Sequence, residues 1–138
     1  MTNQEIGLAC IIDDDKMYVN LVKRIVEAKN LCKNLMVFQN GMDAIVYFKT
    51  LLGNLDKACI PEIIFLDLNM PVMDGWEFLE KFTKIKNKLG KTIILYIVSS
   101  SINPVDIERA KGINSVEDYL IKPVTIEDLE AVFSKKTT

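Results

Sequence analysis

Four polar segments directly follow apolar runs of the chain, and their side chains could do chemistry. They are Asp13–Asp15, Asp67, Ser99–Ser101 and Lys122. If the apolar runs are neighbouring parallel strands, three carboxylates meet at one edge of a sheet. Carboxylates at such short distances repel one another, so the ionised cluster needs a cation. Because the chain has no histidine and its three cysteines show no C-x-x-C spacing, oxygen ligands remain, and these favour Mg²⁺ or Mn²⁺.

A lysine and a serine hydroxyl beside such a cluster indicate a pocket for a phosphoryl group on a carboxylate. Catalysis there needs mostly positioning and neutralisation of charge, and an aspartate that forms an acyl phosphate is established chemistry. Each residue also has an ordinary structural role. Asp14 or Asp15 could cap a helix, and Asp67 could lie in a turn. The serines could form a turn and a cap, and Lys122 could be a solvated surface residue. Their joint placement favours the site.

The elements that must position these residues alternate along the chain. Apolar runs predict five strands, and the helical spacing of apolar residues between them predicts five helices. This alternation predicts an α/β fold with a doubly wound parallel sheet, whose ligand site lies beyond the carboxyl ends of the strands. The expected strands are Gly7–Ile12, Leu35–Phe38, Ile63–Leu66, Thr92–Val98 and Tyr119–Ile121. The expected helices are Lys16–Ala28, Met42–Leu52, Trp76–Ile85, Pro104–Lys111 and Ile126–Phe133.

Length and composition limit the classes of protein to consider. The 138 residues fit one domain over residues 1–138, with a core at about 6–133 and no output domain. The absence of histidine excludes Ser-His-Asp and Cys-His machinery, histidine-ligated zinc and an in-chain phosphohistidine. A net charge of −2 offers no basic field for nucleic acid. No apolar run approaches the ~20 residues of a membrane span, and no basic segment begins a secretory signal, so we expect a cytoplasmic protein.

Four motifs carry a resemblance to a known family. They are IIDDD, FLDLNMPVMDG, IVSSS and YLIKP, in that order and at the expected strand ends. The sequence resembles the receiver domain of response regulators of two-component systems, of the stand-alone chemotaxis type, over essentially the whole chain. This resemblance implies a flavodoxin-like sheet of order 2-1-3-4-5 with five helices. The sequence departs from the commonest pattern of this family at Ser99, where threonine is more usual. It also departs in Gly112–Glu117, which looks longer than the usual turn before the last strand.

The resemblance implies a role for each acidic motif residue. Asp67 would be the phosphoacceptor and a metal ligand. Asp14 would bind Mg²⁺ directly, and Asp13 would bind it directly or through water. Asn69 would offer its backbone carbonyl to the metal, while its side chain, near the attacking water, tunes hydrolysis. Asp15 is an additional acid that could serve only to cap the first helix.

The resemblance also implies how the phosphoryl group is held and sensed. Ser99 would donate its hydroxyl to a phosphoryl oxygen, and Lys122 would pair with the group, aimed inward by a cis peptide bond to Pro123. Ser101 occupies a position that tunes hydrolysis of the acyl phosphate. Tyr119 fits the aromatic switch that turns inward as Ser99 closes on the phosphate. A strand residue with a solvated hydroxyl is the alternative for Tyr119.

The function implied is that of a cytoplasmic phosphoacceptor switch. A histidine kinase or histidine phosphotransfer protein would supply the phosphoryl group, which agrees with the absence of histidine from this chain. Phosphorylation would change the surface of the fourth helix, last strand and last helix for a downstream protein target that the sequence does not name. Homodimerisation on phosphorylation stays open.

Two other classes remain as alternatives. One is a Mg²⁺-dependent phosphatase of the haloacid-dehalogenase type, which also uses an aspartate nucleophile. Such sites favour aspartate where this chain has Asn69, and the chain leaves no room for a substrate-capping insertion. The other is a phosphate-independent interaction module, against which the complete set Asp14, Asp67, Ser99 and Lys122 argues.

Overall fold

The computed structural model describes residues 6–137, and describes side chains as far as Ser134. Strands and helices alternate along it, as the sequence predicts. All neighbouring strand pairs of the five-stranded sheet are parallel, in the order β2-β1-β3-β4-β5. The strands are β1 (Ile6–Ile12), β2 (Cys32–Phe38), β3 (Ile63–Leu66), β4 (Ile94–Ser99) and β5 (Val116–Ile121). The α-helices are α1 (Lys16–Ala28), α2 (Gly41–Leu51), α3 (Gly75–Ile85), α4 (Pro104–Lys111) and α5 (Ile126–Thr137), and short 3₁₀ turns cover Lys57–Cys59 and Lys86–Leu89.

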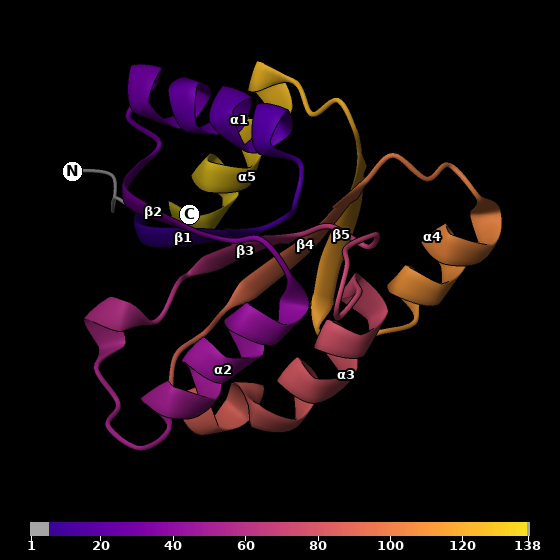
Figure 1. Cartoon of the computed structure of the whole chain (residues 1–138). Helices are drawn as coiled ribbons and strands as arrows, with labels where there is room; N and C mark the ends of the chain where they lie inside the picture. The colour runs from indigo at the N-terminus through magenta and orange to yellow at the C-terminus, as the bar shows by residue number, and fades with distance from the viewer. Residues whose placement is uncertain (1–5, 138) are drawn as a thin grey trace.

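Helices cover both faces of the sheet, so the central strands are buried on both sides. Helices α1 and α5 lie on one face, and α2, α3 and α4 lie on the other (Figure 1). Strand β3 shows the consequence, because its side chains alternate between two separate cores. Ile63 and Phe65 join the core with α1 and α5, whereas Ile64 and Leu66 join the core with α2 and α3. All four side chains are apolar, which is why this strand was predicted with its observed bounds.

The first three helices begin with a side-chain cap at the carboxyl edge of the sheet. Asp15 accepts a hydrogen bond from the Tyr18 N–H, and Asn40 caps α2 in the same way. Asp74 forms a reciprocal capping box with Glu77 at the start of α3. These caps fix the residue at which each loop ends and its helix begins. The role of Asp15 as a helix cap, which was one possibility from the sequence, is confirmed.

The predictions for the edge strands were too short. Strand β2 begins at Cys32 and β5 at Val116, because an edge strand tolerates exposed polar residues such as Asn34 and Asp118. The segment Gly112–Glu117 is therefore no long turn, since its last two residues belong to β5. Other boundaries shift as well: β4 covers Ile94–Ser99 instead of Thr92–Val98, and α5 continues to Thr137 instead of Phe133.

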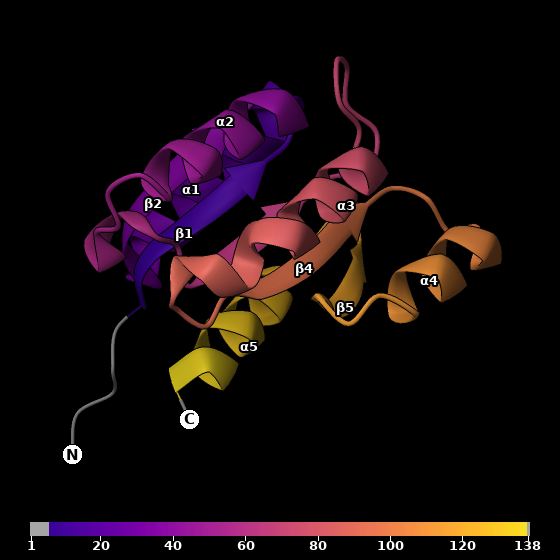
Figure 2. The ribbon, with the colours of Figure 1, turned by 90° about the horizontal axis from the view of Figure 1, so that it is seen from below.

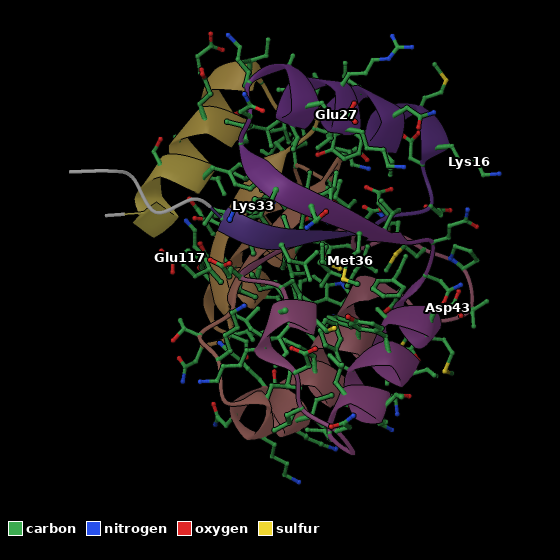
Figure 3. The ribbon with its side chains drawn as sticks, turned by 90° about the vertical axis from the view of Figure 1, so that its left-hand side faces the viewer. Lys16, Glu27, Lys33, Met36, Asp43 and Glu117 are labelled. Atoms are coloured by element: carbon green, nitrogen blue, oxygen red, sulfur yellow. The ribbon has the colours of Figure 1, made fainter. Side chains whose placement is uncertain are left out.

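The loops that follow the strands lie at the carboxyl edge of the parallel sheet. Figure 2 shows the segment between β3 and α3 projecting beyond this edge. Figure 3 views the sheet from its β2 edge, with Lys33 near the start of this strand and Met36 further along it. Lys16 in the first turn of α1 and Asp43 in the first turn of α2 lie at the opposite end from Lys33 (Figure 3). The loops that carry the predicted site residues therefore share one end of the molecule.

Candidate functional site

The strands bring three of the predicted carboxylates into one cluster. Asp13 follows β1 and Asp67 follows β3, and both are buried, whereas Asp14 is exposed. Each of these three residues offers a carboxylate oxygen, and the three oxygens lie within 4.8 Å of one another. An all-oxygen donor set of this charge suits a hard divalent cation. The donors therefore fit Mg²⁺ or Mn²⁺.

Backbone hydrogen bonds extend the sheet by one residue to hold the two buried acids. The Asp67 N–H donates to the Ile12 carbonyl over 2.9 Å, and the Asp13 N–H donates to the Phe38 carbonyl over the same distance. The N–H of Asp15 also donates to Asp13 Oδ1 over 2.9 Å. The positions of both carboxylates thus follow from the strand register, in which Ile12 lies opposite Leu66.

Lys122 is the cation at this cluster. Its Nζ lies 2.9 Å from Asp13 Oδ2 and 3.9 Å from Asp67 Oδ1, and its side chain is only 15% exposed. The Lys122–Pro123 peptide bond is cis. The Lys122 N–H donates to the Ser99 carbonyl, which ties the end of β5 to the end of β4. The ammonium is thus placed between the two buried acids, closer to Asp13.

Burial and mutual repulsion perturb the two buried carboxyls. Burial, followed by the nearby charge of Asp13, raises the pKa of Asp67 to about 6, while Lys122 and the N–H of Asn69 act in the opposite direction. Burial likewise raises the pKa of Asp13, and its hydrogen bond from Lys122 opposes the increase. The Lys122 ammonium therefore compensates the buried carboxylates only in part, which leaves a net attraction for a further cation.

The predicted hydroxyl groups lie on Ser99, the last residue of β4, and on Ser101 in the loop after it. Ser99 is fully buried, and its Oγ accepts a hydrogen bond from the Ser101 N–H. Ser101 Oγ donates to Asp106 Oδ2 over 2.7 Å, and the hydroxyl of half-buried Tyr119 donates to the Ser101 carbonyl over 2.9 Å. Tyr119 thus contacts the loop that follows Ser99. Its hydroxyl is engaged by the protein in this conformation.

Asn69 and Trp76 follow Asp67 along the chain, and of these two only Asn69 was predicted as a site residue. Asn69 is exposed, in the projecting segment between β3 and α3. Trp76 lies at the start of α3, where the guanidinium of Arg109 stacks 4.2 Å from the centre of its ring. This contact joins α3 to α4 next to the site. Trp76 is therefore a suitable optical probe of the region.

Tyr18 is a residue of the site that was not predicted from the sequence. It follows the acidic motif in the first turn of α1, and the centre of its ring lies 4.5 Å from Lys122 Nζ. Burial and the charges of Asp13, Asp67 and Asp15 raise the pKa of its hydroxyl. Nothing in the sequence distinguishes this tyrosine from an ordinary half-buried helix residue. The contact appears only once α1 and the end of β5 are packed together.

The comparison with known families agrees with this fold. The model of the response regulator receiver domain matches residues 9–134. The chain therefore belongs to the family of response regulator receiver domains, as the four motifs suggest. Among residues 6–137, no helix has the length and apolar character needed to cross a lipid bilayer.

Individual relatives support the same assignment. The chain is 32% identical over 129 residues to the nitrate/nitrite response regulator protein NarL of Escherichia coli, covering 94% of this chain and 54% of NarL. It thus spans about half the length of that relative. It is 26% identical over 119 residues to response regulator Rcp1 of Synechocystis, covering 86% of this chain and 78% of Rcp1.

Solved structures share the whole fold. A two-component response regulator from Cytophaga hutchinsonii matches with a TM-score of 0.80 and 27% identity, covering 96% of this chain and 98% of that chain. The Mn²⁺-bound form of Rcp1 matches with a TM-score of 0.72 and 22% identity, covering 94% of this chain and 90% of that one. The predicted flavodoxin-like strand order is confirmed.

Proposed function

We propose that this chain is a phosphoacceptor switch in which Asp67 receives a phosphoryl group from a phosphohistidine of a partner. The partner would be a histidine kinase or a histidine phosphotransfer protein. The observation that carries the proposal is the cluster of Asp13, Asp14 and Asp67 with the Lys122 ammonium between the two buried acids. A carboxylate nucleophile and neutralising cations are what phosphoryl transfer to aspartate requires.

Asp13, Asp14, Asp67 and the Asn69 backbone carbonyl would hold a Mg²⁺ ion. When bound, this ion neutralises the phosphoryl oxygens and the carboxylates. The match to Rcp1, which has a Mn²⁺-bound structure, supports a divalent cation of this kind. Lys122, whose Nζ lies 2.9 Å from Asp13 and 3.9 Å from Asp67, would supply a further positive charge beside the ion.

In the transfer step, a carboxylate oxygen of Asp67 attacks phosphorus. The P–O bond forms as the P–N bond to the partner histidine breaks, and the nitrogen keeps the bonding electron pair. Lys122 would then pair with one phosphoryl oxygen, and the buried Ser99 hydroxyl would donate to another. Ser101 and Asn69, which flank the site, would tune how fast water hydrolyses the acyl phosphate.

The output would pass through the loop after β4. If Ser99 moves toward the phosphoryl group, Ser101 moves with it, and the hydrogen bond from Tyr119 to Ser101 must change. Helix α4 is tied to this loop through Asp106. The surface of α4, β5 and α5 would therefore differ between the two states and recognise a downstream protein.

The test is intact-mass measurement after incubation with Mg²⁺ and acetyl phosphate. We expect the mass of one phosphoryl group to be gained by the wild type and not by Asp67→Ala. Asp43→Ala, which alters an exposed acid in α2, is the matched control and should gain the group normally. A wild type that gains no mass, or an Asp67→Ala variant that does, would contradict the proposal. Steady turnover of a phosphate ester would instead support a phosphatase.

A further inference from the structure

Tyr18 is fixed next to the site by its own helix. It lies in the first turn of α1, where its N–H donates to the Asp15 side chain over 3.1 Å. The half-buried ring packs against the core between the sheet and helices α1 and α5. Its ring centre lies 4.5 Å from Lys122 Nζ. Helix α1 therefore presents an aromatic face to the ammonium that the proposed transfer uses.

The Tyr18 ring gives the Lys122 ammonium a cation–π contact in addition to its contacts with two carboxylates. A lysine side chain has four flexible methylene groups and sets no geometry of its own. Here the carboxylates of Asp13 and Asp67 hold the ammonium by charge, at 2.9 and 3.9 Å. An aromatic face attracts the same cation through its quadrupole and displaces water from it. A metal ion or a phosphoryl group would change the charges of the carboxylates. The attraction between the Tyr18 ring and the ammonium does not depend on these charges.

We propose that Tyr18 is a positioning residue for phosphotransfer to Asp67, whose ring holds the Lys122 ammonium within reach of the incoming phosphoryl group. This inference rests on the proposed function. The ring of Tyr18, and not its hydroxyl, would position the Lys122 ammonium. A phenylalanine should therefore substitute for Tyr18, whereas a leucine of similar apolar character should not.

The test compares initial rates of phosphorylation by acetyl phosphate at saturating Mg²⁺. We expect Tyr18→Phe to stay within about twofold of the wild type, because it keeps the aromatic face. Tyr18→Leu should be slower by about three- to thirtyfold, the range that corresponds to one partly buried cation–π contact. Tyr47→Leu, which removes another half-buried tyrosine on α2, controls for lost stability and should react at the wild-type rate. Thermal unfolding of each variant shows that it is folded.

A double-mutant cycle distinguishes positioning from general disturbance. In a Lys122→Met background, Tyr18→Leu should slow the reaction no further, because the contact is already lost. The affinity for beryllofluoride, a phosphoryl mimic, read from Trp76 fluorescence in the same four proteins, gives the cycle a second readout.

Three results would overturn the inference: Tyr18→Leu as fast as the wild type, Tyr18→Phe as slow as Tyr18→Leu, or additive effects in the cycle. Failure of the proposed function looks different. In that case the wild type itself gains no phosphoryl group on Asp67. A wild type that is phosphorylated normally, with no effect of Tyr18→Leu, would refute only the role of Tyr18.

Discussion

Gly75 lies directly against the backbone of Asp67. A Cβ atom on Gly75 would lie 2.5 Å from the Asp67 carbonyl oxygen and 2.8 Å from the Leu68 Cα. The Gly75 N–H donates to the Leu68 carbonyl over 2.9 Å, which holds the start of α3 in this position. The absence of a side chain thus allows α3 to begin beneath the candidate phosphoacceptor.

Replacing Gly75 with alanine should therefore disturb both the fold and the site. Because the neighbouring atoms belong to the backbone, they cannot rotate away, and we expect a loss of about 1–3 kcal/mol in the free energy of unfolding. The rate of phosphorylation should also fall. Urea unfolding and intact mass measure the two effects. Gly53→Ala is the control, since its Cβ would meet only the Thr50 carbonyl at 3.5 Å.

The raised pKa of Asp67 predicts a pH-dependent stability in metal-free protein. Folding raises this pKa from 3.8 to about 6, so the folded state binds the proton more tightly than the unfolded state. The resulting contribution of Asp67 to the free energy of unfolding is complete when the pH is below the pKa of the unfolded state. It is lost as the pH rises through about 6. Relative to Asp67→Asn, the wild type should lose up to about 3 kcal/mol of stability from about pH 4 to about pH 8.

Urea unfolding in the presence of a chelator, at a series of pH values, measures this difference. Parallel stability curves for the two proteins would refute the prediction. Added Mg²⁺ should restore much of the lost stability of the wild type at neutral pH, because the ion binds the ionised carboxylates of the folded state. Asp67→Asn should gain less.

Lys122 is expected to compete with a bound cation for Asp13. Since Lys122 Nζ lies 2.9 Å from Asp13 Oδ2, a metal ion bound there experiences repulsion from the ammonium. Lys122→Met should therefore bind Mg²⁺ about tenfold more tightly while it is phosphorylated more slowly. Titration of Trp76 fluorescence with Mg²⁺ measures the affinity.

The control for Lys122→Met is Lys91→Met. Lys91 is also partly buried, and its Nζ donates to the carbonyls of Lys57 and Ile60, away from the site residues. This variant should leave the Mg²⁺ affinity unchanged. Unchanged affinity in Lys122→Met would show that the ammonium does not oppose the metal.

The adjacent acids Asp14 and Asp15 should have separable effects. Asp14 belongs to the carboxylate cluster, whereas Asp15 caps α1. Asp14→Ala should lose most of its Mg²⁺ affinity with little change in stability. Asp15→Ala should lose about 1 kcal/mol of stability and retain most of its Mg²⁺ affinity. Parallel Mg²⁺ titrations and urea unfolding of the two variants provide the comparison, and a reversed pattern would contradict these roles.

The sequence was sufficient to predict the parts of the fold that depend on burial. The run Ile63–Leu66 is buried on both faces, so its apolar pattern indicates both its length and its central position. The polar starts of β2 and β5 carry no such signal, because hydrogen bonding to the neighbouring strand places them in the sheet. The central strand was therefore predicted with its observed bounds, whereas the predicted edge strands were shorter than the observed ones.

The same distinction applies to the site. Asp13, Asp67 and Lys122 could be grouped from sequence because parallel strands end at a common edge. Contacts between a helix and that edge could not be predicted, since they depend on how each helix packs. Tyr18 beside Lys122 and Gly75 beneath Asp67 are both of this kind. They become visible only in three dimensions.

The dependence of the site on strand register has a practical consequence. Asp67 reaches the cluster because Leu66 lies opposite Ile12, and a shift of one residue would turn its side chain to the other face of the sheet. A molecule with a misaligned β3 could therefore keep its secondary structure and still lack the cation site. If the chain binds Mg²⁺ as proposed, the fraction of a preparation that responds to Mg²⁺ would count the correctly assembled molecules and offer a quality assay for refolded or engineered versions of the chain.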